Sequence, residues 1–178
     1  MIAWHEIHAA PWAQLQRARE SDRLPHALLL TGPAGLGKLA FAEMLAGSLL
    51  CDTPTSDGRA CGQCTACTWH ASGNHPDFRR IRPEAYEDEI VGEDEGKSSA
   101  KADRKKSEQI RIDQIRGLED FVQVGSHRGR RVILIEPAEA MNEATANALL
   151  KSLEEPPAGV HFLLVSHAAE RLLPTVRS

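Results

Sequence analysis

The chain has 178 residues, of which 42% are hydrophobic and 26% charged, with a formal net charge of -4 at pH 7. This size and composition predict one globular domain, or one domain with a small insert, and the net charge argues against a broadly basic surface. No apolar run approaches the ~18 residues of a membrane-spanning helix, and the N-terminus does not resemble a signal peptide. We therefore expect a cytoplasmic protein without membrane association, in which clustered cysteines indicate metal or redox chemistry.

The first half of the chain predicts a helix, a strand and a second helix before a cysteine-rich segment. Trp12 and Leu15 share one face of a helix at residues 12–21. Residues 27–31, ALLLT, are typical of a buried parallel strand that ends at a glycine-rich turn. An amphipathic helix is then predicted at residues 38–50, with these positions inward: Leu39, Ala42, Leu45 and Leu49. After the cysteines, HPDFRRIRP at residues 75–83 predicts another strand.

The second half begins with a charged segment. Seven acidic residues in 84–95 are followed by five basic ones in 97–106, with few large apolar residues, so we expect a mobile loop at 84–108. A helix capped by Asp113 is expected next, with Ile115, Leu118 and Val122 on its apolar stripe.

Two strands, RRVILIE and VHFLLVS, flank the last long helix. That helix is NEATANALLKSLEEPP, stopped by Pro156 and Pro157, with these residues inward: Ala146, Leu149, Leu150 and Leu153. Strands that alternate with helices predict an α/β fold, in which helices cover both faces of a parallel sheet.

The turn after the first strand, TGPAGLGKLA at residues 31–40, has the pattern of a phosphate-binding loop. Its glycines let backbone N–H groups face one concavity at a helix N-terminus, and Lys38 adds a mobile positive charge. The alternative is a glycine-rich turn that binds nothing. The candidate nucleotide-binding residues are Gly32, Pro33, Ala34, Gly35, Leu36, Gly37, Lys38, Leu39 and Glu136.

Two positions of this candidate site lack the groups that handle magnesium. Leu39 stands where a Ser or Thr hydroxyl normally binds Mg²⁺, and a hard cation requires oxygen ligands. Glu136 stands where the magnesium-positioning Asp is expected, and Pro137 where a catalytic Glu usually follows. Glu139 is a substitute two residues beyond the expected place. Efficient ATP hydrolysis is therefore not expected, while binding of ATP without hydrolysis stays open.

The chain's four cysteines are spaced C-x9-C-x2-C-x2-C, and the candidate metal ligands are Cys51, Cys61, Cys64 and Cys67. Four thiolates complete a tetrahedral Zn²⁺ site and leave no open position, so the zinc is expected to be structural. A redox C-x-x-C pair and an iron–sulfur cluster are the alternatives. His70 and His75 are nearby spare ligands, more typical of surface histidines.

Taken in order, these motifs resemble bacterial clamp-loader subunits, the AAA+ subunits of DNA polymerase III that comprise gamma/tau and delta-prime. The resemblance covers nearly the whole chain apart from the charged loop. It rests on the phosphate loop, the cysteine spacing, NHPDF, IRIDQIR, the highly specific NALLKSLEEPP, and ERLLPTVRS. It implies a P-loop NTPase (AAA+) three-layer sandwich over residues 1–178, with a small four-cysteine zinc-module insert at 51–70.

Within that family, degenerate ATP sites are characteristic of delta-prime subunits. The resemblance therefore implies a non-hydrolysing stator without enzymatic activity of its own. It would pack beside gamma/tau and delta subunits and help load the sliding clamp on primed DNA. A gamma/tau-like ATPase is the alternative. A zinc-dependent nucleic-acid binder is a third, disfavoured because Arg59 is the one basic residue between Cys51 and Cys67.

The resemblance also implies family elements beyond residue 178. The family's arginine finger follows a serine that matches Ser178, so the finger would be residue 179, and we do not assign its role to Arg177. The lid and collar would follow as well, so the chain is expected to be a truncated N-terminal domain. Without the strand that comes next in the family, residues 27–31 should form an exposed sheet edge that favours self-association.

Overall fold

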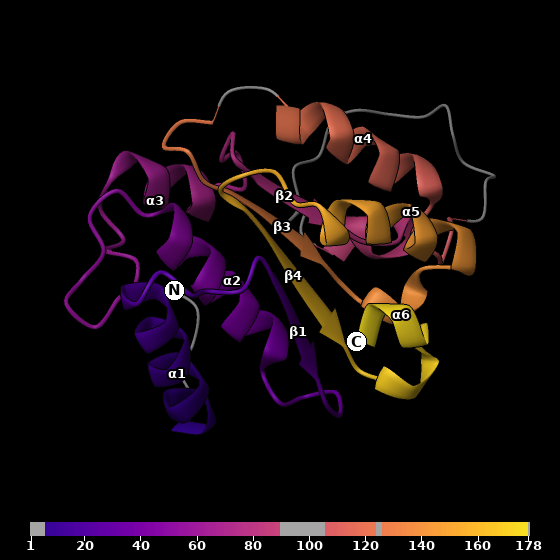
Figure 1. Ribbon diagram of the computed structural model, residues 1–178, viewed down its shortest axis with the longest axis horizontal. Coiled ribbons are helices and arrows are strands. Elements are labelled where there is room, and N and C mark those ends of the chain that lie inside the picture. The colour runs from indigo at the N-terminus through magenta and orange to yellow at the C-terminus, as the bar shows by residue number, and fades with distance from the viewer. Residues whose placement is uncertain (1–5, 90–105, 124–125, 178) are drawn as a thin grey trace.

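The computed structural model describes residues 6–89, 106–123 and 126–177, which form the predicted α/β fold (Figure 1). The strands are β1 (Ala27–Thr31), β2 (Phe78–Ile81), β3 (Arg131–Ile135) and β4 (Val160–Ser166). The α-helices are α1 (Ala9–Glu20), α2 (Lys38–Leu50), α3 (Thr65–Ala71), α4 (Ile112–Gln123), α5 (Glu143–Glu154) and α6 (Pro174–Arg177). Short 3-10 helices are η1 (Glu6–His8), η2 (Glu84–Glu89), η3 (Ala138–Ala140) and η4 (Ala169–Arg171).

The four described strands form one parallel sheet in the order β1-β4-β3-β2. Because they are parallel, the segments that follow β1, β3 and β4 leave the sheet at the same edge, where α/β folds bind their ligands. The order also leaves β1 with no other described strand on its outer side. This confirms its expected position at the end of the sheet.

Each face of the sheet packs against its own layer of helices (Figure 1). Side chains alternate between the faces along β3 and β4, as the pleat of a strand requires. On one face α4, α5 and α6 cover Ile133, Ile135, Phe162 and Leu164. On the other, α1 and α2 cover Val132, Leu134, Leu163 and Val165. The three layers match the prediction, and β3 is buried along its whole length, as expected for a central parallel strand.

Helix α2 differs from the prediction because it is buried on nearly all sides instead of being amphipathic. Phe41, Ala46 and Leu50 are buried together with the predicted inward positions Ala42, Leu45 and Leu49. The ring of Trp12 in α1 meets Phe41 edge-on, with centroids 6.0 Å apart. On another side His70 of α3 lies so close to Gly47 that a Cβ there would be 3.2 Å from its ring. Helices α1 and α3 therefore cover the faces of α2 that the hydrophobic periodicity predicted to be exposed to solvent.

The two later helices begin with different capping arrangements. Asn142 caps α5 by accepting a 2.9 Å hydrogen bond from the Thr145 N–H, and the helix ends before Pro156, as predicted. The predicted cap at Asp113 is wrong, since α4 begins at Ile112 and Asp113 lies inside its first turn. Instead, the Gln114 side chain accepts a 2.9 Å hydrogen bond from the Arg111 N–H, which is half of a capping box.

The charged segment at 84–108 is ordered at its described ends. Residues 84–89 form η2, and the Ala85 N–H donates to the Ser107 carbonyl at 3.1 Å. Arg111 also pairs with Glu84. Residues 90–105 lie outside the described part of the chain, so the mobility of this loop stays a prediction.

Candidate functional site

The candidate phosphate loop connects β1 to α2 at the carboxyl edge of the sheet. Gly32, Gly35 and Gly37 have φ angles of 138°, 84° and 71°, and Gly37 is the N-cap of α2. Side chains other than glycine rarely adopt these angles, so the glycines make the tight turn possible. The chain thus makes the tight strand-to-helix turn that a phosphate-binding loop requires.

Lys38 folds back across its own loop. Its Nζ donates to the carbonyls of Gly32 at 2.7 Å and Pro33 at 2.6 Å, and the residue is only 8% exposed. Burial lowers the pKa of Lys38, and the negative charge of Glu139 partly opposes that shift. An incoming phosphate would therefore have to replace two hydrogen bonds that already satisfy this ammonium.

Leu39 packs into the apolar layer around α1 and α2. The side chain that replaces the usual hydroxyl thus contributes to the core and offers no oxygen to a cation. Leu36, in contrast, is 43% exposed, and its Cδ1 lies 3.3 Å from where a Cβ on Gly32 would be. An apolar side chain therefore lies over the start of the loop.

Glu136, the first residue after β3, is held by an arginine that the sequence analysis did not identify. Arg80 on β2 donates through Nη2 to Glu136 at 2.9 Å and through Nη1 to Glu43 of α2 at 2.7 Å. The three side chains are 16–26% exposed, so the network is partly shielded from water. The carboxylate expected to face magnesium is therefore already neutralised by an ion pair.

Glu139 is the carboxylate that acts on the loop. Its Oε1 accepts a 2.9 Å hydrogen bond from the His167 N–H, just after β4. Its Oε2 is buried and has no hydrogen-bond partner within the described residues, and its charge acts on Lys38. The candidate substitute named from the sequence thus lies at this edge of the sheet, within η3, the short helix that follows β3.

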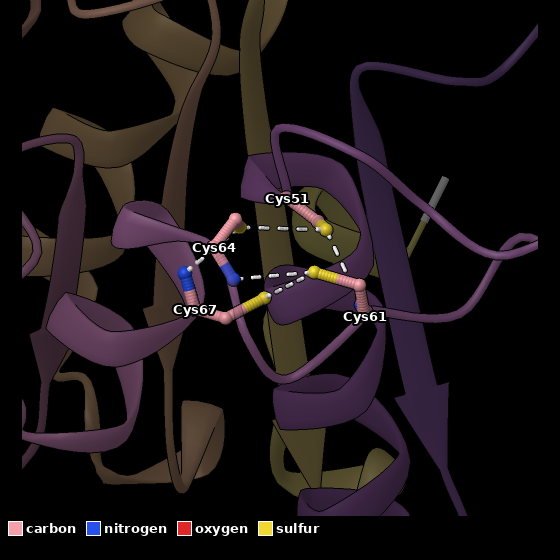
Figure 2. Close-up of side chains that lie close together, drawn as sticks. All are labelled: Cys51, Cys61, Cys64 and Cys67. Atoms are coloured by element: carbon pink, nitrogen blue, oxygen red, sulfur yellow. Dashed lines mark hydrogen bonds between the residues drawn. The ribbon is translucent and has the colours of Figure 1, made fainter.

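The four cysteines converge between the end of α2 and the start of α3 (Figure 2). Their sulfur atoms all lie within 4.8 Å of one another, with Cys51 to Cys64 at 3.8 Å and Cys61 to Cys67 at 3.9 Å. A disulfide would bring two sulfurs to about 2.05 Å, so these are free thiols. With a metal–sulfur distance of about 2.3 Å, a tetrahedron has edges of about 3.8 Å, which fits this cluster.

Local hydrogen bonds prepare these sulfurs to act as thiolates. Backbone N–H groups donate to the sulfurs of Cys51, Cys61 and Cys64 at 3.3–3.5 Å. The pKa of Cys61 is lowered to about 6, chiefly by a hydrogen bond from the Thr53 hydroxyl and, to a smaller extent, by the backbone N–H groups that donate to its sulfur. Burial raises the pKa of Cys51 and Cys67, whose thiols a divalent cation would have to deprotonate.

His70 and His75 lie outside the cysteine cluster; His75 is buried and His70 half-buried, whereas the sequence suggested surface histidines. His70 packs edge-on against Phe78, with ring centroids 4.8 Å apart, and its Nε2 lies 3.3 Å from the Glu43 carbonyl. His75 is 5% exposed, and its Nδ1 accepts a 3.0 Å hydrogen bond from the Asp77 N–H. They join the module to α2 and β2.

Together these features define a class of protein: a three-layer α/β domain with a glycine-rich strand-to-helix turn at the carboxyl edge of its sheet and an inserted four-cysteine cluster. Comparison of the sequence with known protein families identifies the family within this class. The chain belongs to the family described as DNA polymerase III, delta subunit, whose sequence model matches residues 7–178. Within the described residues, no helix has both the length and the apolar character that crossing a membrane requires.

Curated relatives carry the name DNA polymerase III subunit delta'. The one from Pseudomonas aeruginosa is 46% identical over 171 residues, which cover 94% of this chain and 46% of the relative. The one from Escherichia coli K12 is 32% identical, and the matched residues cover 99% of this chain and 47% of the relative. A tau subunit from Salmonella typhimurium is 32% identical over 88% of this chain but only 21% of its own length. The chain thus spans less than half of each of these relatives.

The solved structure of a gamma subunit-related protein from Thermotoga maritima shares the fold. It has a TM-score of 0.56 and 22% sequence identity, over 92% of this chain and 43% of that one.

Proposed function

We propose that this chain is the N-terminal AAA+ domain of a delta-prime-like clamp-loader subunit, which helps to load the sliding clamp on primed DNA without hydrolysing ATP. The observation that carries the proposal is the condition of the phosphate loop. Leu39 is half-buried and packs against the apolar core, and Arg80 neutralises Glu136. Both groups that would handle magnesium are thus missing from the site. Membership of the delta subunit family supports the same role.

The partners in this proposal are gamma/tau and delta subunits, with the clamp and primed DNA contacted through the assembly, in the cytoplasm. Named delta' and tau relatives among the similar proteins support an assembly of related subunits. The net charge of -4 fits a subunit whose DNA contacts are local or made by a partner. This domain would contribute a docking surface, while ATP turnover belongs to its neighbours.

A gamma/tau-like ATPase is the second candidate, and one pair of residues favours it. Lys38 is retained, and Glu139 is close enough for its charge to act on that lysine. If nucleotide displaced the two carbonyls from Lys38, Glu139 would supply an oxygen that Leu39 cannot. This candidate predicts magnesium-dependent nucleotide binding.

The cysteine cluster is proposed to hold one structural Zn²⁺ through Cys51, Cys61, Cys64 and Cys67. The support is the tetrahedral fit, since four thiolate ligands leave no coordination position for a substrate. When bound, the ion would fix the connection between α2 and α3. The module then acts as a rigid extension of the domain.

Calorimetric titration with a non-hydrolysable ATP analogue and Mg²⁺ tests the two candidates. The chain should give no binding heat, no thermal shift and no ATP turnover, and it should still co-sediment with a gamma/tau subunit. Leu39→Thr alone should not produce ATP hydrolysis, because Glu136 is still engaged in its ion pair with Arg80. Micromolar Mg²⁺-dependent binding by the unmodified chain would support the ATPase instead. Failure to associate with gamma/tau would remove the clamp-loader role.

A further inference from the structure

A cavity lies at the edge of the sheet opposite the candidate phosphate loop. It has a volume of about 260 Å³ and adjoins the cysteine cluster at Cys51. The ends of α1 and α2 and the segments that precede β2 and β3 line it. Its polar lining residues are Arg19, Asp52, His75, Asp77, His127, Arg128 and Arg130.

The two carboxylates in this lining already have cationic or N–H partners. Asp52 lies 2.7 Å from Arg128 Nε. Asp77 lies 3.5 Å from Arg131 Nε and accepts a 2.8 Å hydrogen bond from the His127 N–H. The negative charges of the cavity are therefore compensated by neighbouring groups.

Arg19 and Arg130 have no carboxylate partner among the described residues. Arg19 donates to the Ser48 hydroxyl at 3.0 Å, and Arg130 is exposed. Burial lowers the pKa of Arg19, and the nearby charge of Arg130 lowers it further. The fold thus brings two guanidinium groups to one cavity, although they repel each other.

His75 adds a buried hydrogen-bond donor to the lining of this cavity. Because its Nδ1 accepts the Asp77 N–H and burial lowers its pKa, the neutral ring carries its proton on Nε2. That Nε2 is buried and has no hydrogen-bond partner within the described part of the chain. A buried N–H without an acceptor destabilises the fold, and an anion in the cavity would supply that acceptor.

We propose that Arg19, Arg130 and His75 form a binding site for a single phosphate group beside the cysteine cluster. Guanidinium forks match phosphate oxygens, and the volume exceeds the roughly 30 Å³ of a water several-fold, which leaves space for the group. Among the described lining residues only two cations are uncompensated, so the site holds one phosphate and does not follow a nucleic-acid backbone, which needs several contacts. The group comes from free inorganic phosphate or from the terminal phosphate of a DNA strand. This site is independent of the proposed clamp-loader role.

The test is an NMR titration in which the side-chain ¹⁵N signals of the zinc-loaded chain are recorded as inorganic phosphate is added. A parallel titration with chloride at equal ionic strength is the control. The Nε–H signals of Arg19 and Arg130 and the Nε2–H signal of His75 should shift saturably, while that of Arg116 on α4 should not. Arg130→Gln should weaken binding about tenfold, because one charge-assisted hydrogen bond is lost. Arg116→Gln, the matched exposed control, should leave the affinity unchanged.

A second titration distinguishes free phosphate from the terminal phosphate of DNA. It compares a 5′-phosphorylated oligodeoxynucleotide with an unphosphorylated oligodeoxynucleotide of the same sequence. Preference for the phosphorylated strand, with competition by inorganic phosphate, supports the site and assigns the group to a DNA end. Saturable binding of inorganic phosphate alone supports the site and assigns it to the free ion. The proposal is overturned if no signal saturates with either probe, if Arg130→Gln and Arg116→Gln bind equally, or if both strands bind alike without phosphate competition.

Discussion

Replacement of Arg80 by glutamine tests whether the ion-pair network at the carboxyl edge of the sheet stabilises the fold. Arg80 joins Glu43 and Glu136 at 2.7 and 2.9 Å, and the side chains are 16–26% exposed. Glutamine keeps some polar contact but leaves two carboxylates facing each other without a cation. The variant should therefore be less stable than the unmodified chain.

The magnitude follows from the burial of the network. Exposed ion pairs contribute about 0–1 kcal/mol, whereas removal of one partner from a buried pair costs about 3–5 kcal/mol. For this partly shielded network we expect a loss of about 2 kcal/mol. In a chain of this size that corresponds to a melting temperature lower by about 4–8 °C.

Urea unfolding of the zinc-loaded protein measures the loss. Arg79→Gln on the same strand is the control, since Arg79 is exposed and its guanidinium lies 5.1 Å from the Phe121 ring centroid, an interaction of about 0.5–1 kcal/mol. The double variant Arg80→Gln, Glu136→Gln should recover about half of the loss, because one carboxylate becomes neutral. A loss no larger than that of Arg79→Gln, or no recovery in the double variant, would refute the reasoning.

Three further predictions concern the metal, a histidine and the sheet edge. Cys61→Ser should release the bound metal, seen as loss of the roughly one zinc per chain by elemental analysis; full retention would exclude the four-cysteine site. Burial lowers the pKa of His161, so the stability from its neutral form is complete above about pH 6.5 and is lost as the pH falls below that. His161→Gln should flatten the fall in unfolding free energy between about pH 7 and 5, and the exposed control His167→Gln should not; equal slopes would contradict this assignment. The outer edge of β1 should make the chain self-associate, measured as a sedimentation coefficient that rises with concentration; a monomer throughout would show that the edge is protected.

Local patterns determined much of the architecture. The apolar run of β1, the glycines of the loop and the helix stop at Pro156 each act on neighbouring residues, so their structural effect can be predicted from the sequence. Cysteine spacing likewise indicated the cluster, because C-x-x-C turns bring two sulfurs together locally. These elements were predicted correctly for that reason.

Only the tertiary structure decided how distant side chains meet. Periodicity describes one helix at a time, so it could not show that α1 and α3 cover the remaining faces of α2. Arg80 reaches Glu136 because the strand order places β2 beside β3, and the packing of α2 on the sheet brings Glu43 to the same arginine. Arg19 reaches the cavity from the end of α1 and Arg130 from the segment that precedes β3. The sequence by itself determined that a glycine-rich strand-to-helix turn and a cysteine cluster are present, while through-space pairing between remote segments decided which charges surround them.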